Sequence, residues 1–333
     1  MHAEVGNWFD TRTTRVGDWH TSRLVDIKGD TRVSVVLPAL NEEATVGAIV
    51  TAIRHRLIER HGLVDELIVM DSGSTDGTYA AATDAGAIVV RREEVLGGFR
   101  PLPGKGEVLW RSLAATTGDI LVFVDSDLHN FTPSFVAGLL GPLLTDPKIH
   151  LVKATYDRPL THGEHVAPAG GGRVTELVAR PLINMYWPKL AGFVQPLSGE
   201  YAARRPLLEQ LPFPTGYGVE IGILVDALRL VGLDGLAQVD LYRRKHRNQE
   251  IGKLGRMASE ILQVVQTRLE REGRMAMNRP PSTSMVQWER SDDGYLPLIV
   301  DVTPHERPPM YTVPEYWATP GGRSRPAGEQ RAS

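Results

Sequence analysis

Residues 119–130 read Asp-Ile-Leu-Val-Phe-Val-Asp-Ser-Asp-Leu-His-Asn. Five apolar residues run without a break to Asp125, and Asp127 follows two positions later. Such a run is typical of a strand buried on both faces, as in a parallel sheet between helices. Because side chains alternate along a strand, both carboxylates should face one side with Ser126 opposite. The carboxyl ends of such strands bind ligands, and two carboxylates there favour a divalent cation over the alternative of surface or helix-capping acids.

The pattern of short apolar strands and helices extends toward the N-terminus. Residues 33–37, 67–70 and 87–90 are predicted strands, and each is followed by a helical stretch. Asn41 is positioned to cap the first of these helices, with acidic residues in its first turn. Strands that alternate with helices predict an α/β fold with a doubly wound, mostly parallel sheet over residues 33–127.

The composition limits the classes of function. The chain has 333 residues, of which 37 are basic and 40 acidic, and its net charge is -3. The overall electrostatic potential therefore does not favour binding to nucleic acid. It has no cysteine, which excludes disulfides and thiolate metal sites and suits a reducing compartment. We find no signal peptide pattern and no transmembrane segment, and we expect a cytoplasmic protein.

Two familiar nucleotide motifs are absent. The turn after the first strand is Pro-Ala-Leu-Asn, without the Gly-x-Gly-x-x-Gly of a dinucleotide fold. Residues 98–105 differ from a phosphate loop in spacing, and Gly106 replaces the Ser or Thr that the loop requires. Lys105 either binds a phosphate as a point charge from a flexible loop or is solvated. The dehalogenase-type phosphatases also end a strand in Asp-x-Asp, but in their first strand, whereas here it is the fourth.

Three motifs in order resemble the nucleotide-sugar half of GT-A-type glycosyltransferases: Val-Val-Leu-Pro-Ala-Leu-Asn-Glu-Glu, Ile-Val-Met-Asp-Ser-Gly-Ser-Thr-Asp-Gly-Thr and Asp-Ile-Leu-Val-Phe-Val-Asp-Ser-Asp. In the second half, Gly-Gly-Gly-Arg-Val-Thr, Pro-Leu-Ser-Gly-Glu-Tyr-Ala, Gly-Tyr-Gly-Val-Glu and Arg-Lys-His-Arg-Asn-Gln resemble the actinobacterial glucosyl-3-phosphoglycerate synthases. The resemblance spans most of residues 30–275.

The resemblance implies a fold, a reaction and a set of binding residues. The fold is a GT-A sheet with a smaller acceptor-binding half, and the reaction is retaining transfer of glucose from UDP-glucose to the 2-hydroxyl of 3-phosphoglycerate. Mg²⁺ or Mn²⁺ would bridge the diphosphate and stabilise the charge on the leaving UDP. The nucleotide-sugar residues would be Pro38, Ala39, Leu40, Glu42, Asp71, Ser72, Lys105, Asp125 and Ser126.

The resemblance also implies the metal, acceptor and catalytic residues. Asp127 would bind the metal together with His246, although a histidine among basic residues is also typical of a solvated face. The acceptor would be held by Gly172, Arg173, Thr175 and Asn248, where arginine can pair with an oxyanion bidentately; a flexible surface loop is the alternative. The residues at the reacting centre would be Glu220, the backbone carbonyl of Leu197, and Asp127.

We predict four segments. Residues 1–31 form an extension packed on the body, residues 32–150 the nucleotide-sugar half, residues 151–275 the acceptor half with a terminal helix, and residues 276–333 a Pro/Gly-rich, partly ordered tail. By resemblance we expect a homodimer. The alternatives are a transferase with another donor or acceptor, such as GDP-mannose or a lipid phosphate, a metal-dependent phosphohydrolase, and a catalytically silent nucleotide-binding protein.

Overall fold

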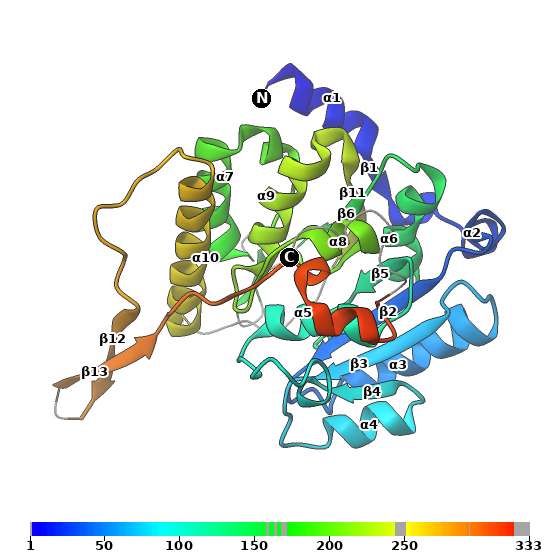
Figure 1. The fold of residues 1–333 in the computed structure, drawn as a ribbon, viewed down its shortest axis with the longest axis horizontal. Coiled ribbons are helices and arrows are strands. Elements are labelled where there is room, and N and C mark those ends of the chain that lie inside the picture. The colour runs from blue at the N-terminus through cyan, green and yellow to red at the C-terminus, as the bar shows by residue number, and fades with distance from the viewer. Residues whose placement is uncertain are drawn as a thin grey trace.

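The computed structural model describes residues 2–157, 160–162, 165–167, 172–243, 251–292 and 294–322. Its centre is an eight-stranded sheet in the order β1-β11-β6-β9-β5-β2-β3-β4 (Figure 1). Only β9 runs antiparallel to its neighbours in this sheet, so the prediction of a mostly parallel α/β sheet is confirmed. Its strands are β1 (Thr13–Arg15), β2 (Val33–Ala39), β3 (Glu66–Asp71), β4 (Ile88–Arg91), β5 (Ile120–Phe123), β6 (Leu151–Asp157), β9 (Tyr201–Arg204) and β11 (Leu236–Arg243).

Helices cover both faces of the sheet, and each face has its own hydrophobic cluster. One cluster includes α5 (Lys105–Ala115), α7 (Arg180–Tyr186), α8 (Arg205–Gln210), α9 (Val219–Val231) and α10 (Ile251–Arg271). The other includes α2 (Thr21–Lys28), α3 (Val46–Ile53), α4 (Thr78–Asp84) and α6 (Ser134–Thr145). Shorter helical segments are η1 (Val16–Asp18), η2 (Arg54–Glu59), η3 (Arg92–Glu94), η4 (Thr175–Ala179), η5 (Pro188–Gly192), η6 (Leu233–Gly235), η7 (Met310–Thr312) and η8 (Pro314–Ala318).

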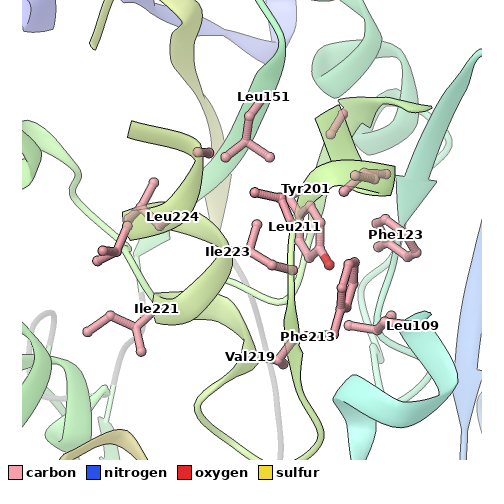
Figure 2. Packing of buried hydrophobic residues seen from close by; sticks show 14 of the residues in the cluster. Leu109, Phe123, Leu151, Tyr201, Leu211, Phe213, Val219, Ile221, Ile223 and Leu224 are labelled. Atoms are coloured by element: carbon pink, nitrogen blue, oxygen red, sulfur yellow. The ribbon is translucent and has the colours of Figure 1, made fainter. Parts of the chain in front are cut away.

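Strand β5 shows why its sequence is apolar without interruption. Leu121 and Phe123 belong to the first cluster, whereas Ile120 and Val122 belong to the second, so successive side chains enter opposite cores. Figure 2 shows Phe123 and Tyr201 in the first cluster, and their ring centroids are 4.7 Å apart. Burial on both faces fixes the strand and thereby the turn that carries Asp125 and Asp127.

The N-terminal residues are part of the main body. Helix α1 (Ala3–Arg12) leads into β1, which pairs in parallel with β11 at the edge of the sheet. Trp8 is buried and its indole N–H donates to the carbonyl of Leu236 at 2.8 Å. Trp19 packs on Gly141, where a Cβ atom would lie 2.0 Å from the indole. These contacts account for the two tryptophans of the segment.

The chain after α10 forms further strands. β12 (Ser284–Ser291) and β13 (Gly294–Asp301) make an antiparallel hairpin that projects beside α10 (Figure 1). β14 (Glu306–Arg307) then pairs with β10 (Phe213–Pro214) next to α5 and α9. Earlier in the chain, β7 (Leu160–His162) pairs antiparallel with β8 (His165–Ala167).

Buried charges fix β14. The carboxylate of Glu107 accepts hydrogen bonds from Arg111 at 2.7 Å and from Arg307 at 2.6 and 2.9 Å. On the other side Arg268 pairs with Asp226 at 2.7 Å and with Glu306. The C-terminal segment is therefore anchored to α5, α9 and α10.

One local prediction is wrong. Asn41 does not cap the helix that follows it, because α3 begins at Val46 with Thr45 at its N-cap position. Asn41 instead takes a left-handed backbone conformation with φ of 58°, and its side-chain oxygen accepts the backbone N–H of Thr75 at 2.9 Å. The side chain thus joins the turns after β2 and β3.

Candidate active site

A cleft of about 850 Å³ lies at the carboxyl ends of β2, β3 and β5. It contains residues from both halves of the chain, and most of the residues selected from the sequence line it. These are Pro38, Ala39, Leu40, Glu42, Ser72, Lys105, Asp125, Ser126, Asp127, Gly172, Arg173, Thr175, Leu197 and Glu220. His246 and Asn248 lie outside the residues that the structure describes.

The turns after β2, β3 and β5 are joined by hydrogen bonds. The hydroxyl of Ser126 donates to the carbonyl of Pro38 at 2.8 Å, and the N–H of Ser72 donates to the carbonyl of Ala39 at 2.9 Å. Asp71 is buried, and its carboxylate accepts the N–H of Ser74 at 2.9 Å. Asp71 is not among the residues that line the cleft, so this hydrogen bond shapes the turn beside it.

The centre of the cleft holds an ion cluster of Lys105, Asp125 and Glu220. The Lys105 Nζ atom lies 2.5 Å from Asp125 Oδ1 and 3.0 Å from Glu220 Oε1. Burial opposes the charge on Lys105, but Asp125 and Glu220 outweigh it and raise the pKa of this lysine well above its usual value. Lys105 begins α5 and Glu220 lies in the first turn of α9, so each sits on a helix and not in a flexible loop.

Gly199 packs directly against this cluster. A Cβ atom at this position would lie 2.3 Å from Asp125 Oδ2 and 2.5 Å from Lys105 Nζ, far inside ordinary contact distance. Gly104, which precedes Lys105, allows a different close approach, because a Cβ there would lie 2.2 Å from the carbonyl of Thr215. Glycine thus lets the backbone at position 199 reach the ion cluster, and lets the start of α5 lie against the backbone of Thr215.

The second carboxylate of the motif lies in a different setting. Both carboxylates line the cleft, but Asp125 is paired with Lys105, whereas Asp127 acts on Glu42, whose pKa is raised by burial and by the charge of Asp127. A hard divalent cation prefers such carboxylate oxygens and binds through one or two of them when a phosphorylated ligand supplies others. Among the described residues no group of three or more acids or histidines could hold a metal. The carboxylates of the cleft fit an ion whose other ligands come from a phosphorylated molecule.

The acceptor-side residues enter from the start of η4. Gly172 has φ of 78°, and its carbonyl accepts the N–H of Glu176 at 3.0 Å, which turns the chain into helical structure. Thr175 is buried, whereas Arg173 is half-buried at the cleft. The turn brings Arg173 to the same cleft as Asp127, although 45 residues separate them in sequence.

Sequence reasoning missed one wall of the cleft. It is formed by Gly216, Tyr217, Arg256, Met257, Glu260 and residues 299–305. Glu260 accepts the N–H of Tyr217 at 2.7 Å and pairs with Arg256 at 2.9 Å. Tyr217 stands within the Gly-Tyr-Gly-Val-Glu motif, which was a usable signal. Residues 299–305 gave none, because the pairing of β14 with β10 places them there.

Comparison with known proteins agrees with this architecture. The family model for glycosyl transferase family 2 matches residues 34–193. A glucosyl-3-phosphoglycerate synthase from Mycolicibacterium smegmatis is 50% identical over 306 residues, which cover 92% of this chain and 98% of the relative. The chain belongs to the glucosyl-3-phosphoglycerate synthase family.

Three solved structures extend the comparison. One is the glucosyl-3-phosphoglycerate synthase of Mycobacterium tuberculosis in complex with Mn²⁺, UDP-glucose and phosphoglyceric acid. It aligns with this chain with a TM-score of 0.78 and 47% identity, over 90% of this chain and 98% of that one. The same enzyme has been solved with Mg²⁺ and UDP. A mannosyl-3-phosphoglycerate synthase from Rubrobacter xylanophilus gives a TM-score of 0.85 and 39% identity over 92% of this chain and 99% of that one.

Proposed function

We propose that this protein transfers glucose from UDP-glucose to the 2-hydroxyl of 3-phosphoglycerate with retention of the anomeric configuration. One observation carries the proposal. A single cleft joins Asp127 and the Lys105 cluster to Arg173, in a chain 47% identical to an enzyme solved with Mn²⁺, UDP-glucose and phosphoglyceric acid. Asp127 in this cleft suits a metal ion, and Arg173 suits an anionic acceptor.

On the donor side, Pro38, Ala39, Leu40 and Glu42 would hold the uridine beside Asp71 and Ser72. Hydrogen bonds from Ser72 to Ala39 and from Thr75 to the Asn41 side chain join the turns after β2 and β3, which favours a surface formed before the ligand binds. Lys105 and Asp125, with Ser126 behind them, would contact the nucleotide sugar. Lys105 is held by two carboxylates and is therefore fixed as a charged donor.

The metal would be held by Asp127 and His246. A bound Mg²⁺ or Mn²⁺ supplies charge to the diphosphate as the bond to the sugar breaks. The fit rests on the carboxylate of Asp127 at the cleft, because such cations prefer carboxylate oxygens.

On the acceptor side, Arg173 would grip the phosphate or carboxylate of 3-phosphoglycerate together with Gly172, Thr175 and Asn248. A guanidinium can donate two parallel hydrogen bonds to such a group, which fixes the acceptor's orientation as well as its position. Correct orientation is itself a large part of catalysis, because it replaces an encounter between two molecules by a step within one complex.

Retention follows from attack on the same face as the leaving group. The bond between the anomeric carbon and the phosphate oxygen breaks, the acceptor oxygen bonds to that carbon, and its proton passes to the leaving phosphate. Glu220 is paired with Lys105 at 3.0 Å, so its carboxylate is held in place and suits the orientation of a sugar or acceptor hydroxyl. The backbone carbonyl of Leu197 would line the sugar.

Product analysis tests the proposal. The purified chain would be incubated with Mg²⁺ and UDP-glucose, with 3-phosphoglycerate present or omitted. We expect UDP release only with the acceptor, and an α-linked product whose anomeric proton coupling shows retention. UDP release that does not depend on 3-phosphoglycerate would contradict the acceptor, and release of inorganic phosphate would favour the phosphohydrolase.

A second candidate is transfer of mannose from GDP-mannose. It is favoured by the likeness to the mannosyl-3-phosphoglycerate synthase of Rubrobacter xylanophilus, which is 39% identical with a TM-score of 0.85. The same assay with GDP-mannose separates the two donors, because the donor with the higher kcat/KM is the physiological candidate.

We also propose a homodimer in the cytoplasm. The β12–β13 hairpin supports the dimer, since it exposes large apolar side chains at Val286, Trp288, Tyr295, Leu296, Leu298 and Ile299, and such patches are typical of protein interfaces. Sedimentation would give twice the chain mass.

The cysteine-free composition suits a reducing compartment, and cell fractionation tests the location. No helix within the described ranges has the length and apolar character to cross a membrane.

A further inference from the structure

A lysine in the middle of the sheet has no role in the function described above. Lys153 lies in β6, between Tyr201 of β9 and Gln238 of β11 in register, and its side chain is buried. Its neighbours Val152 and Ala154 belong to the opposite core. Lysine is rarely buried so fully, because an ammonium group loses its hydration there. Some specific partner must therefore require its charge.

That partner is the loop behind the sugar side of the cleft. The Nζ atom of Lys153 donates to the carbonyl of Ser198 at 2.9 Å and lies 5.0 Å from the ring centroid of Tyr201. The N–H of Ser198 donates to the carbonyl of Gln195 at 3.0 Å, which closes a turn. Lys153 thus holds this turn from beneath.

Gln238 supports the same loop. Its side-chain oxygen accepts the N–H of Val194 at 3.0 Å, and its nitrogen donates to the carbonyl of Gly192 at 3.0 Å. Adjacent strands therefore present two buried polar side chains to successive parts of residues 192–198. The loop rests on the sheet through specific hydrogen bonds as well as apolar packing.

The front of the turn faces the cleft. Leu197 and Gly199 line the cleft, whereas Ser198 between them does not. The Ser198–Gly199 peptide is trans, so its carbonyl and N–H point in opposite directions. With the carbonyl directed at Lys153, the Gly199 N–H is directed away from the sheet. The backbone of Gly199 also abuts the Lys105–Asp125 pair.

We propose that Lys153 is a positioning residue for the hexose of the donor, which it serves by anchoring the turn at residues 196–199 from beneath. The inference rests on the proposed function, because it requires a sugar nucleotide in the cleft. Lys153 itself does not contact the donor. Its ammonium sets the position and orientation of Leu197 and Gly199, and these two residues contact the donor.

The electrostatic surroundings suit a group that acts by charge. Burial, helped by the charge of Lys105, lowers the pKa of Lys153 to about 8, although Glu220, Glu200 and Asp125 oppose this shift. The buried phenol of Tyr201 faces it as well. Lys153 is therefore charged at neutral pH and loses its proton more readily than a solvated lysine.

Lys153→Met tests the inference, because methionine has similar length and no charge. We expect kcat/KM for UDP-glucose to fall about tenfold to a hundredfold, the range for loss of a hydrogen bond from a charged group. Calorimetric titration with UDP and Mg²⁺ should give an unchanged Kd, since UDP has no hexose. Thermal unfolding should show a melting temperature equal to or above that of the wild type, because relief from desolvation offsets the lost bond.

Lys28→Met is the matched control, since Lys28 is also buried but pairs with Asp65 at 3.0 Å away from the cleft. It should leave the donor parameters unchanged. An unchanged kcat/KM in Lys153→Met, or equal losses for UDP and UDP-glucose, would overturn the inference. Lys153→Gln, which keeps an N–H donor, should recover part of the activity if the methionine variant folds poorly. A wild-type chain that binds UDP-glucose without transferring glucose would contradict the proposed function alone.

Discussion

Gly199→Ala is the most direct perturbation of the site. The new methyl group would lie 2.3 Å from Asp125 Oδ2 and 2.5 Å from Lys105 Nζ, whereas ordinary contacts begin at 3.4 Å. The ion pair must therefore move by about 1 Å, and a displacement of that size at a reacting centre can reduce the rate about a hundredfold. The cost to folding should be modest, about 1–3 kcal/mol for an overpacked methyl group.

Steady-state kinetics with UDP-glucose and 3-phosphoglycerate would measure this effect, and thermal unfolding would confirm that the variant is folded. Gly97→Ala is the control, because no heavy atom lies within 4 Å of a Cβ at Gly97. We expect normal kinetics from the control and a large fall in kcat from Gly199→Ala. Wild-type kinetics in Gly199→Ala would show that the contact between this turn and the ion pair is not needed for catalysis.

Four further predictions use other parts of the structure. Asp127→Ala should abolish turnover and metal-dependent UDP binding in calorimetry, and retained binding would place the metal elsewhere. Arg173→Ala should raise the Michaelis constant for the acceptor far more than the one for UDP-glucose; equal changes would remove Arg173 from the acceptor site. Glu107→Ala should lower the free energy of unfolding in urea by about 3–5 kcal/mol, because two buried arginines lose their shared carboxylate, and an unchanged midpoint would contradict this. The pKa of Lys153 is lowered from 10.5 to about 8, so between these values the unfolded chain binds more protons than the folded one; wild-type stability should therefore rise with pH across this window relative to Lys153→Met, and a constant difference would refute the shift.

The parts of the fold that the sequence predicts are those with strong local patterns. The apolar runs of β2, β3 and β5 are buried on both faces, and this burial is what makes them uninterrupted. Asp71 ends β3, and Asp125 and Asp127 follow β5; their place at the carboxyl ends follows from the strand pattern alone. The family resemblance named the remaining site residues, and their individual roles stay predictions.

The parts that the sequence did not predict depend on contacts between distant residues. Strand β9 has only four residues, and its sequence predicts no more than a segment that precedes a helix. In the structure it pairs with both β5 and β6. Strand β1 exists because it pairs with β11. The contact of Lys105 with Glu220 joins residues 115 positions apart. No local propensity encodes such contacts.

The position of β9 has a consequence for synthesis of the chain on the ribosome. β9 alone connects the strands of the first half, which end at β5, to those of the second half, which begin at β6. At about 5–20 residues per second, Tyr201 is made roughly 4–16 s after Phe123. During that interval β5 and then β6 have an open edge that can pair with another nascent chain. Slower translation between these strands should therefore increase aggregation, and a chaperone that covers strand edges should reduce it.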